Sequence, residues 1–318
     1  MSEKDSLRPI YVGHRKFLGA LDLVVSFYTQ KCQFNCSFCN LPLQSYDGKI
    51  NAEQINAQID WVFTSNFEKL QTFQQLSIGN EGSILDNIRF PFESLEYLLN
   101  KTFEMPSLKV ISFETRPEYI KKEKFEQVRK LVPNMKLDVT IGFETQDNHL
   151  RQVILNKTIS QKLFESKIAL LGELGVSLTS YIMIKPSPTM TESEGVAEAI
   201  ATIEYLKKLS IKYNVNVTAY LNATYAAKGT PLASALVANS YIPPRIQNVA
   251  EILLKTENLG IPIYAGLWSE GNEVIGGNYE AHEDYDANLR KAIKKCNQQG
   301  NLEPLHAHFS PHNYATAN

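Results

Sequence analysis

Three cysteines, Cys32, Cys36 and Cys39, lie within eight residues in a C-x3-C-x2-C pattern, and the chain has four cysteines in all. They follow an apolar run over residues 21–28, which predicts a strand that leads into a loop of thiols. Thiolates bind soft metal centres such as zinc and iron–sulfur clusters. Four ligands close a structural zinc site, whereas three cysteines leave one iron of a [4Fe-4S] cluster open. The spacing therefore predicts a reactive cluster.

This loop resembles the signature of the radical S-adenosylmethionine (SAM) superfamily, in which an aromatic residue precedes the last cysteine, as Phe38 does here. The resemblance implies that Cys32, Cys36 and Cys39 ligate the cluster and that SAM chelates the open iron. It also implies that an electron from an external donor cleaves SAM to methionine and a 5'-deoxyadenosyl radical, which abstracts hydrogen from a substrate. The cofactor would supply the chemistry, and the protein would supply orientation and exclusion of water.

Two other interpretations of the cysteines stay open. Cys296 or a histidine could complete a zinc site, which would make the chain a zinc-binding protein without redox chemistry. Alternatively, the cysteines could be buried structural residues. Cys296 itself stands alone in the expected closing helix, where a small apolar packing role is expected.

Length and composition limit the function classes. The chain has 318 residues, of which 43% are hydrophobic and 21% charged, as in an ordinary globular protein. It has no apolar run of the ~20 residues needed to span a bilayer and no signal peptide, so a cytoplasmic, non-membrane protein is expected. The formal charge of -2 lacks the basic excess typical of proteins that bind nucleic acid through phosphates, although a local basic patch stays open.

The cysteine loop needs a scaffold, and apolar runs that alternate with amphipathic segments predict a parallel sheet with helical crossovers. Six such units predict an α/β fold, a partial (β/α)6 barrel, which is also the fold that the resemblance implies. We expect a polar lead-in over residues 1–20, the barrel over 21–260, and a short C-terminal extension and tail over 261–318. The expected strands are 21–31, 74–78, 109–113, 137–143, 177–184 and 216–221, and the expected helices are 52–64, 92–102, 122–131, 161–174, 192–213 and 244–258.

The extension is expected to contain a strand pair, 261–267 with 272–277, and a closing helix over 285–297. His306, His308 and His312 stand among small polar residues near the end of the chain. Three such histidines can bind metal, but a disordered terminus is the expectation.

Reactive groups of parallel α/β folds collect at the carboxyl ends of the strands. After the second barrel strand, Gly79, Asn80 and Glu81 resemble the G-G-E motif that contacts the SAM amino group in this superfamily, with Asn80 replacing the middle glycine. After the third, Glu114 and Arg116 stand at the barrel mouth before a proline, where they could pair with each other or bind a zwitterion.

The next motifs resemble the branch that contains the Elongator catalytic subunit and the archaeosine-forming radical SAM lyases. Glu144 and Arg151 belong to a G-x-E-T...R...N-K pattern and are expected to contact the ribose hydroxyls and the carboxylate of SAM. Tyr181 and Lys185 follow on the fifth strand, in a segment resembling the lyases' Leu-Leu-Lys-Pro-Pro. Asn222 and Thr224 end the sixth strand, where they could meet substrate or cap a turn.

Two substrate classes follow. Because the chain lacks a basic excess, and because no appended RNA-binding domain or second cysteine cluster is expected, we favour a ribosomally made precursor peptide. The enzyme would be a lyase resembling compact spliceases that cleave C–C or C–N bonds, with a small separate protein recognising the peptide. The alternative is a tRNA nucleobase lyase or modifier resembling archaeosine synthase.

Overall fold

The computed structural model describes residues 7–44, 48–224, 226–267, 274–276 and 279–310. In this part of the chain, eight strands form one sheet in the order β1-β2-β3-β4-β5-β6-β7-β9. Strands β2 to β7 and β9 are parallel to one another, and β1 is antiparallel to β2 at one edge. The bounds are β1 Tyr11–Phe17, β2 Ala20–Phe27, β3 Gln75–Asn80, β4 Val110–Glu114, β5 Lys136–Glu144, β6 Ser177–Ile184, β7 Val217–Ala223 and β9 Ile263–Ala265.

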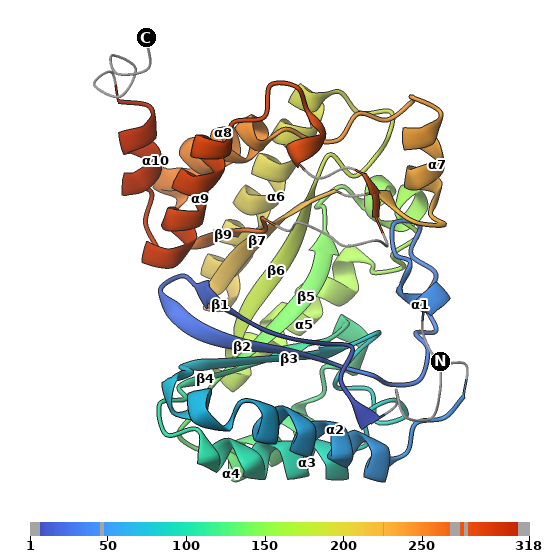
Figure 1. The fold of residues 1–318 in the computed structure, drawn as a ribbon, viewed down its shortest axis with the longest axis vertical. Helices are drawn as coiled ribbons and strands as arrows, with labels where there is room; N and C mark the ends of the chain where they lie inside the picture. Colours follow the sequence, from blue (N-terminus) through green and yellow to red (C-terminus); the bar gives the residue numbers. More distant parts are fainter. Residues whose placement is uncertain (1–6, 45–47, 225, 268–273, 277–278, 311–318) are drawn as a thin grey trace.

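Helices cover the outer face of this curved sheet. Figure 1 shows α2, α3 and α4 below its first strands, with α6, α8 and α9 beyond its last strands. The partial barrel predicted from the sequence is thus confirmed. The helices are α1 Leu41–Gln44, α2 Ala52–Ser65, α3 Phe92–Lys101, α4 Lys122–Leu131, α5 Gln161–Leu174, α6 Glu192–Tyr213, α7 Pro231–Val237, α8 Ile246–Thr256, α9 Ala287–Gln299 and α10 Glu303–His308.

Capping residues explain why helix bounds were predictable. Thr191 and Glu194 form a capping box at the start of α6, and Asn214 ends it in the left-handed conformation. Ser160 accepts a hydrogen bond from the Leu163 amide at the start of α5, and Gly175 ends that helix with a φ of 61°. Both helices therefore begin and end where the sequence predicted.

The two faces of the sheet differ in polarity because side chains alternate along each strand. On the outer face, side chains such as Val25, Val139 and Phe143 belong to the hydrophobic core beneath the helices. On the inner face, the Ser77 hydroxyl donates to Asp22 at 2.9 Å, and the Ser112 hydroxyl donates to Asp138 at 2.6 Å. The inner face of the half-barrel is therefore lined by hydrogen-bonded polar groups.

The beginning of the chain differs from the expected polar lead-in because residues 11–17 form the edge strand β1. Arg15 lies on the inner face, where its Nε donates to Asp22 at 2.8 Å and its guanidinium lies 5.3 Å from the Tyr220 ring centroid. Arg15 and Asp22 thus pair with each other inside the barrel. The apolar pattern of the sequence does not indicate this pairing.

Two expectations for the extension were wrong. Strand β9 pairs with β7 in parallel, and β10, Val274–Gly276, pairs with β8, Ala226–Ala227, rather than with β9. His306 and His308 lie on helix α10, which packs against α9, instead of in a disordered tail. His312 and residues 272, 273 and 277 lie outside the described residues. No helix among the described residues is both long and apolar enough to cross a membrane.

Candidate active site

The cysteine loop follows β2 at the carboxyl end of the parallel strands, and later loops hold its middle part. The Ser37 amide donates to the Leu155 carbonyl at 3.0 Å, and the Ser37 hydroxyl donates to the Ile154 carbonyl at 2.7 Å. The Asn156 side chain donates to the Asn35 carbonyl at 2.7 Å. These partners belong to or follow a single π-helical turn, Leu150–Ile154, after β5. The segment after β5 therefore positions the loop.

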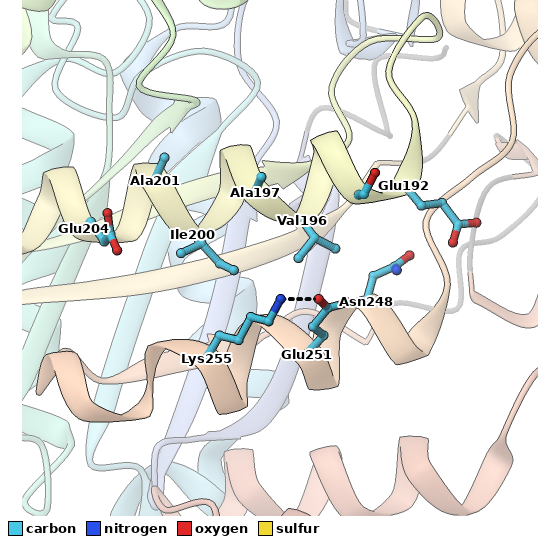
Figure 2. A pocket seen from close by; sticks show the side chains of 10 residues that line it. Glu192, Val196, Ala197, Ile200, Ala201, Glu204, Asn248, Glu251 and Lys255 are labelled. Carbon is cyan, nitrogen blue, oxygen red and sulfur yellow. Dashed lines mark hydrogen bonds and ion pairs between the residues drawn. The ribbon is translucent and has the colours of Figure 1, made fainter.

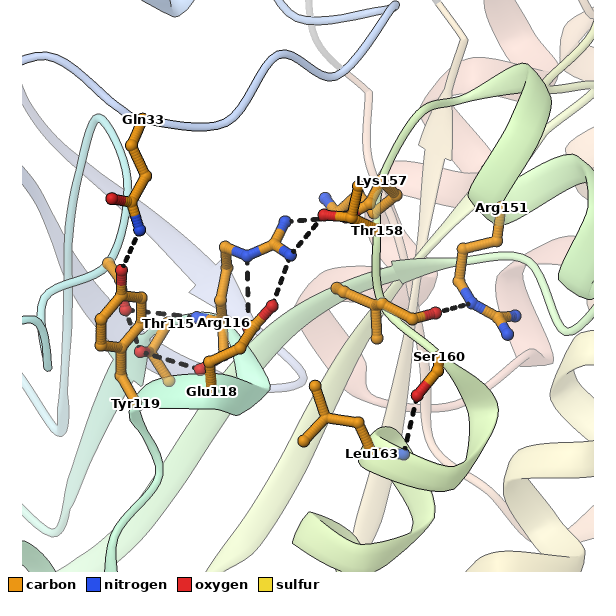
Figure 3. Close-up of polar contacts among 12 residues, drawn as sticks. Gln33, Thr115, Arg116, Glu118, Tyr119, Arg151, Lys157, Thr158, Ser160 and Leu163 are labelled. Atoms are coloured by element: carbon orange, nitrogen blue, oxygen red, sulfur yellow. Dashed lines mark hydrogen bonds and ion pairs between the residues drawn. The ribbon is translucent and has the colours of Figure 1, made fainter.

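The beginning of the loop is held by the segments after β3 and β4. Arg89, whose Nη1 lies 2.5 Å from Asp86, donates from Nε to the Lys31 carbonyl at 3.0 Å. The Gln33 amide donates to the Tyr119 hydroxyl at 2.7 Å, as Figure 3 shows. Three loops from three successive strands therefore contact the cysteine loop.

The three thiols are free and half-buried. Burial raises the pKa of Cys36, although Lys157 and then Arg116 act in the opposite direction, and burial raises the pKa of Cys39 to about 11. Metal binding must therefore displace protons from Cys36 and Cys39. Among the described residues, no three His, Cys, Asp or Glu side chains gather in a group that could hold an ion. The donor set, three soft sulfurs on one loop, suits an iron–sulfur cluster, in which each thiolate binds its own iron.

Cys296 cannot complete a zinc site with these thiols. It is 5% exposed on α9 and belongs to the hydrophobic core. Figure 1 shows α9 on the opposite side of the molecule from α1, which follows the cysteine loop. The expected packing role of Cys296 is thus confirmed.

Glu144 ends β5 at an irregularity in the strand register and has a φ of 71°, the left-handed region that non-glycine residues rarely adopt. Its Oε1 lies 2.8 Å from Nζ of Lys157. A β-carbon on Gly142 would lie 2.5 Å from Oε1 of Glu144 and 2.6 Å from Nζ of Lys157, so a larger residue there would displace the ends of both side chains from this arrangement. Strained backbone of this kind is common where a side chain must point into a site.

Arg116 is nearly buried and lies against the cysteine loop, with its guanidinium 3.5 Å from the ring centroid of Phe34. Its Nη2 lies 2.6 Å from Glu118, and its Nη1 donates to the Lys157 carbonyl at 3.0 Å. Figure 3 shows these bonds converging on Arg116 from both sides. Of the two alternatives for Glu114 and Arg116, a pair between them is not formed, since Glu118 is the partner of Arg116.

Arg151 has 0% exposed surface. Its Nε donates to the Ile159 carbonyl at 2.8 Å and its Nη1 to the Thr145 carbonyl at 2.6 Å, while Nη2 donates to the Asn148 side chain at 3.0 Å. Its guanidinium also lies 4.3 Å from the Phe143 ring centroid. In this conformation Arg151 offers no surface to a ligand, and it organises the segment after β5 instead.

The motif after β3 divides into two kinds of residue. Asn80 holds its own loop, since its side-chain oxygen accepts from the Gly82 amide at 3.0 Å. Gly79 faces Glu114 of the neighbouring strand, and Glu81 is buried beyond the end of β3. The Glu114 carboxylate accepts from the Tyr181 hydroxyl at 3.2 Å. Glu114 is exposed, yet burial raises its pKa, which fits a side chain that protein surrounds and water still reaches.

The remaining predicted residues lie farther along the sheet. Lys185 is buried, has a φ of 59° and donates from Nζ to the Ile242 carbonyl at 2.6 Å. The Thr224 hydroxyl donates to the Ile184 carbonyl at 2.5 Å, as expected of a capping residue. Asn222 is half-buried, and a β-carbon on Gly266 would lie 3.0 Å from its Oδ1. Lys185 and Thr224 thus support the end of β6 and are not presented to a ligand.

The structure adds residues that the sequence analysis gave no role. Lys157 belongs to the N-K motif, but the sequence does not indicate its position. The structure places it in an ion pair with Glu144 near the cysteine loop.

A cluster of tyrosine rings lies on the inner face. The ring centroid of Tyr220 lies 4.9 Å from that of Tyr181 and 4.8 Å from that of Tyr264. The sequence feature that could have indicated this ring cluster is the presence of a tyrosine on each of the strands β6, β7 and β9.

A separate groove of about 680 Å³ lies on the outer face between α6 and α8. Figure 2 shows Val196 and Ile200 of α6 facing Glu251 and Lys255 of α8 across it, with the last two joined by an ion pair of 2.6 Å. The cysteines do not line this groove, and it has no part in the site described above.

No protein-family model matches the chain. It is 25% identical over 303 residues to an uncharacterized protein of Methanocaldococcus jannaschii, covering 92% of this chain and 80% of the relative. It is also 25% identical over 270 residues to the archaeosine synthase subunit beta of Thermococcus kodakarensis, covering 82% of this chain and 78% of the relative.

Among solved structures, the fold is similar to that of a spore photoproduct lyase with bound AdoMet and dinucleoside spore photoproduct. The TM-score is 0.51 at 12% identity, over 76% of this chain and 75% of the other. The fold is thus similar to that of the spore photoproduct lyase, and the sequence is similar to an archaeosine synthase subunit beta, in agreement with the motifs.

Proposed function

We propose that the chain is a radical SAM enzyme in which Cys32, Cys36 and Cys39 hold a [4Fe-4S] cluster with SAM at the open iron. The observation that supports this most is the placement of the cysteine loop. Loops after β3, β4 and β5 hold it at the carboxyl end of the strands, beside the strained Glu144 and its partner Lys157.

Held by Cys32, Cys36 and Cys39, the cluster would supply an electron from an external donor for SAM cleavage, and with it a radical able to abstract hydrogen. The chain's own residues bind and orient. We assign Glu144, Gly79 and Glu81 to SAM binding, because they stand on or beyond the strand ends that flank the cysteine loop. Phe38, directly before Cys39, lies under the Lys157 ammonium group, 5.1 Å from Nζ to its ring centroid, and we assign it to the same site.

The inner face supplies a second group of contacts. Glu114 and Tyr181 form a hydrogen-bonded pair there, and Asn222 lies on the same face of β7. We assign these three residues to SAM or substrate. Asn80, Arg116, Arg151 and Lys185 are positioning residues, because their polar groups already bond to backbone or side-chain partners.

The substrate that we favour is a ribosomally made peptide, presented by a small separate recognition protein. The formal charge of -2 supports it, because phosphate-binding surfaces usually carry a basic excess. The polar inner face, with a carboxylate and phenols, can accept hydrogen-bonding side chains.

A tRNA nucleobase is the second candidate, and the similarity to archaeosine synthase subunit beta supports it. Because that relative is named as a subunit, the similarity also supports a protein partner. Anaerobic affinity purification of the intact chain separates the two, since peptide with a small protein favours the first and co-purified tRNA favours the second.

The radical SAM assignment itself is tested by anaerobic reconstitution with iron and sulfide, followed by reduction in the presence of SAM. We expect 5'-deoxyadenosine and methionine, detected by mass spectrometry. Cys36→Ala should abolish both the cluster and the product. Cys296→Ala is the matched control, since that cysteine packs in the core, and it should retain both.

A further inference from the structure

Lys157 places a cation beside the cysteine loop. Its side chain is 12% exposed, and its Nζ lies 5.1 Å from the ring centroid of Phe38, the residue directly before Cys39. The charge is therefore held in a largely water-excluded position, where it interacts electrostatically with Cys36 and Cys39. At such a position a fixed charge acts more strongly than at the surface.

The backbone fixes where this cation stands. The Lys157 amide donates to the Arg151 carbonyl at 2.9 Å, and the Lys157 carbonyl accepts from Arg116. The residues on either side, Asn156 and Thr158, have φ values of 48° and 56°. Because Asn156 also bonds to the cysteine loop, Lys157 and that loop are held as one unit.

Four charged groups surround this part of the loop. Lys157 pairs with Glu144 at 2.8 Å, and Arg116 pairs with Glu118 at 2.6 Å. Burial lowers the pKa of Lys157, but Glu144 and then Cys36 outweigh it, so the pKa is raised and the lysine stays charged. Glu144 and Lys157 therefore carry opposite charges and lie side by side near the cysteine loop.

We infer that Lys157 raises the reduction potential of the cluster proposed above and that Glu144 lowers it, so that the pair sets the potential at which the cluster accepts its electron. The inference rests on the proposed function. Reduction adds one electron from the external donor and breaks no bond, so the reduced cluster carries one more negative charge. A nearby cation stabilises that state, and a nearby carboxylate destabilises it.

The test is an electrochemical titration of the reconstituted protein without SAM, followed by electron paramagnetic resonance. Lys157→Met should reduce the ratio of reduced to oxidised cluster at a fixed potential by about tenfold, which is 59 mV for one electron. Lys157→Arg should stay near the wild type. Glu144→Gln should move the potential in the opposite direction, which the loss of a purely structural contact would not do.

Lys212→Met is the matched control, because it changes the net charge equally and removes an exposed ion pair, to Glu165 at 3.5 Å, between outer helices. It should not move the potential. An unchanged potential in Lys157→Met with a full cluster, or a shift of the same sign in Glu144→Gln, would overturn the inference. If Lys157→Met cannot hold the cluster, Glu144→Gln decides. A wild-type protein without any cluster counts against the proposed function instead.

Discussion

Gly79 of β3 lies directly beside Glu114 of β4, so that a β-carbon on Gly79 would stand 3.2 Å from both Cβ and Oε2 of Glu114. A side chain at this position of the motif would therefore press on a neighbouring carboxylate. The hydrogen bond from Tyr181 holds the same carboxylate from the other side. Space and hydrogen bonding together orient Glu114 on the inner face.

Gly79→Ala should consequently destabilise the protein by about 1 to 2 kcal/mol, the usual cost of inserting a methyl group into a packed site. Urea unfolding of the protein without cofactors measures the change. In a Glu114→Ala background the cost of Gly79→Ala should fall but not vanish, because the carboxylate is absent while the β-carbon of residue 114, 3.2 Å away, is retained. An equal cost in both backgrounds would mean that Gly79 meets something other than Glu114.

Arg151→Met should cost about 3 to 5 kcal/mol, because it leaves the Thr145 and Ile159 carbonyls buried without a donor. The loss should appear in urea unfolding of the cofactor-free protein. Gln152→Met is the control, because the neighbouring Gln152 makes only a solvent-exposed hydrogen bond to Asn148, and it should change stability by less than about 0.5 kcal/mol. A fully stable Arg151→Met protein with weakened SAM binding would instead make Arg151 a direct contact.

Asp138 predicts a pH dependence of stability. Burial raises its pKa from 3.8 to about 6, against hydrogen bonds from Ser112 and Thr179. The folded chain therefore holds a proton that the unfolded chain loses, so the stabilisation is complete below about pH 4 and is lost as pH rises through 6. Relative to wild type, Asp138→Asn should gain up to about 3 kcal/mol between pH 4 and pH 7.

Urea unfolding of both proteins across that pH range measures the difference. Asp284→Asn, at a position 53% exposed on the surface, is the control and should track the wild type at every pH. A difference between Asp138→Asn and wild type that stays constant with pH would show that the carboxyl is already ionised in the folded protein at pH 4.

Glu144→Ala should weaken SAM binding by about 10- to 100-fold while the iron content stays unchanged, as expected when a charge-assisted contact is lost. Calorimetric titration of the reconstituted protein with SAM measures the affinity. Glu118→Ala, which removes the partner of Arg116 but no proposed SAM contact, should have a smaller effect. Unchanged SAM affinity in Glu144→Ala would remove Glu144 from the binding site.

The sequence predicted most of the barrel because the local signals agree with the tertiary structure. Ser160 and Thr191 cap the starts of helices α5 and α6, and both are residue types that favour this position. Strand β1 was missed because its stability depends on Arg15 meeting Asp22 and aromatic rings from distant strands. Contacts between residues that are far apart in the sequence leave no periodic pattern in it.

The candidate site was predictable in position but only partly in detail. The rule that functional groups collect at the carboxyl ends of parallel strands identified the right segments, because this rule depends on topology alone. Whether a cation faces a ligand or the backbone depends on turns that sequence does not specify. Arg151 and Lys157 are six positions apart in one motif, yet carbonyl groups surround the first and the second pairs with Glu144 beside the cysteines.

The most direct test of the account is iron and sulfide analysis of the anaerobically reconstituted protein, combined with electron paramagnetic resonance after reduction. We expect a [4Fe-4S] signal that changes when SAM is added, and no such signal in Cys36→Ala. A colourless protein that binds zinc through Cys32, Cys36 and Cys39 and takes up no iron would contradict the central claim.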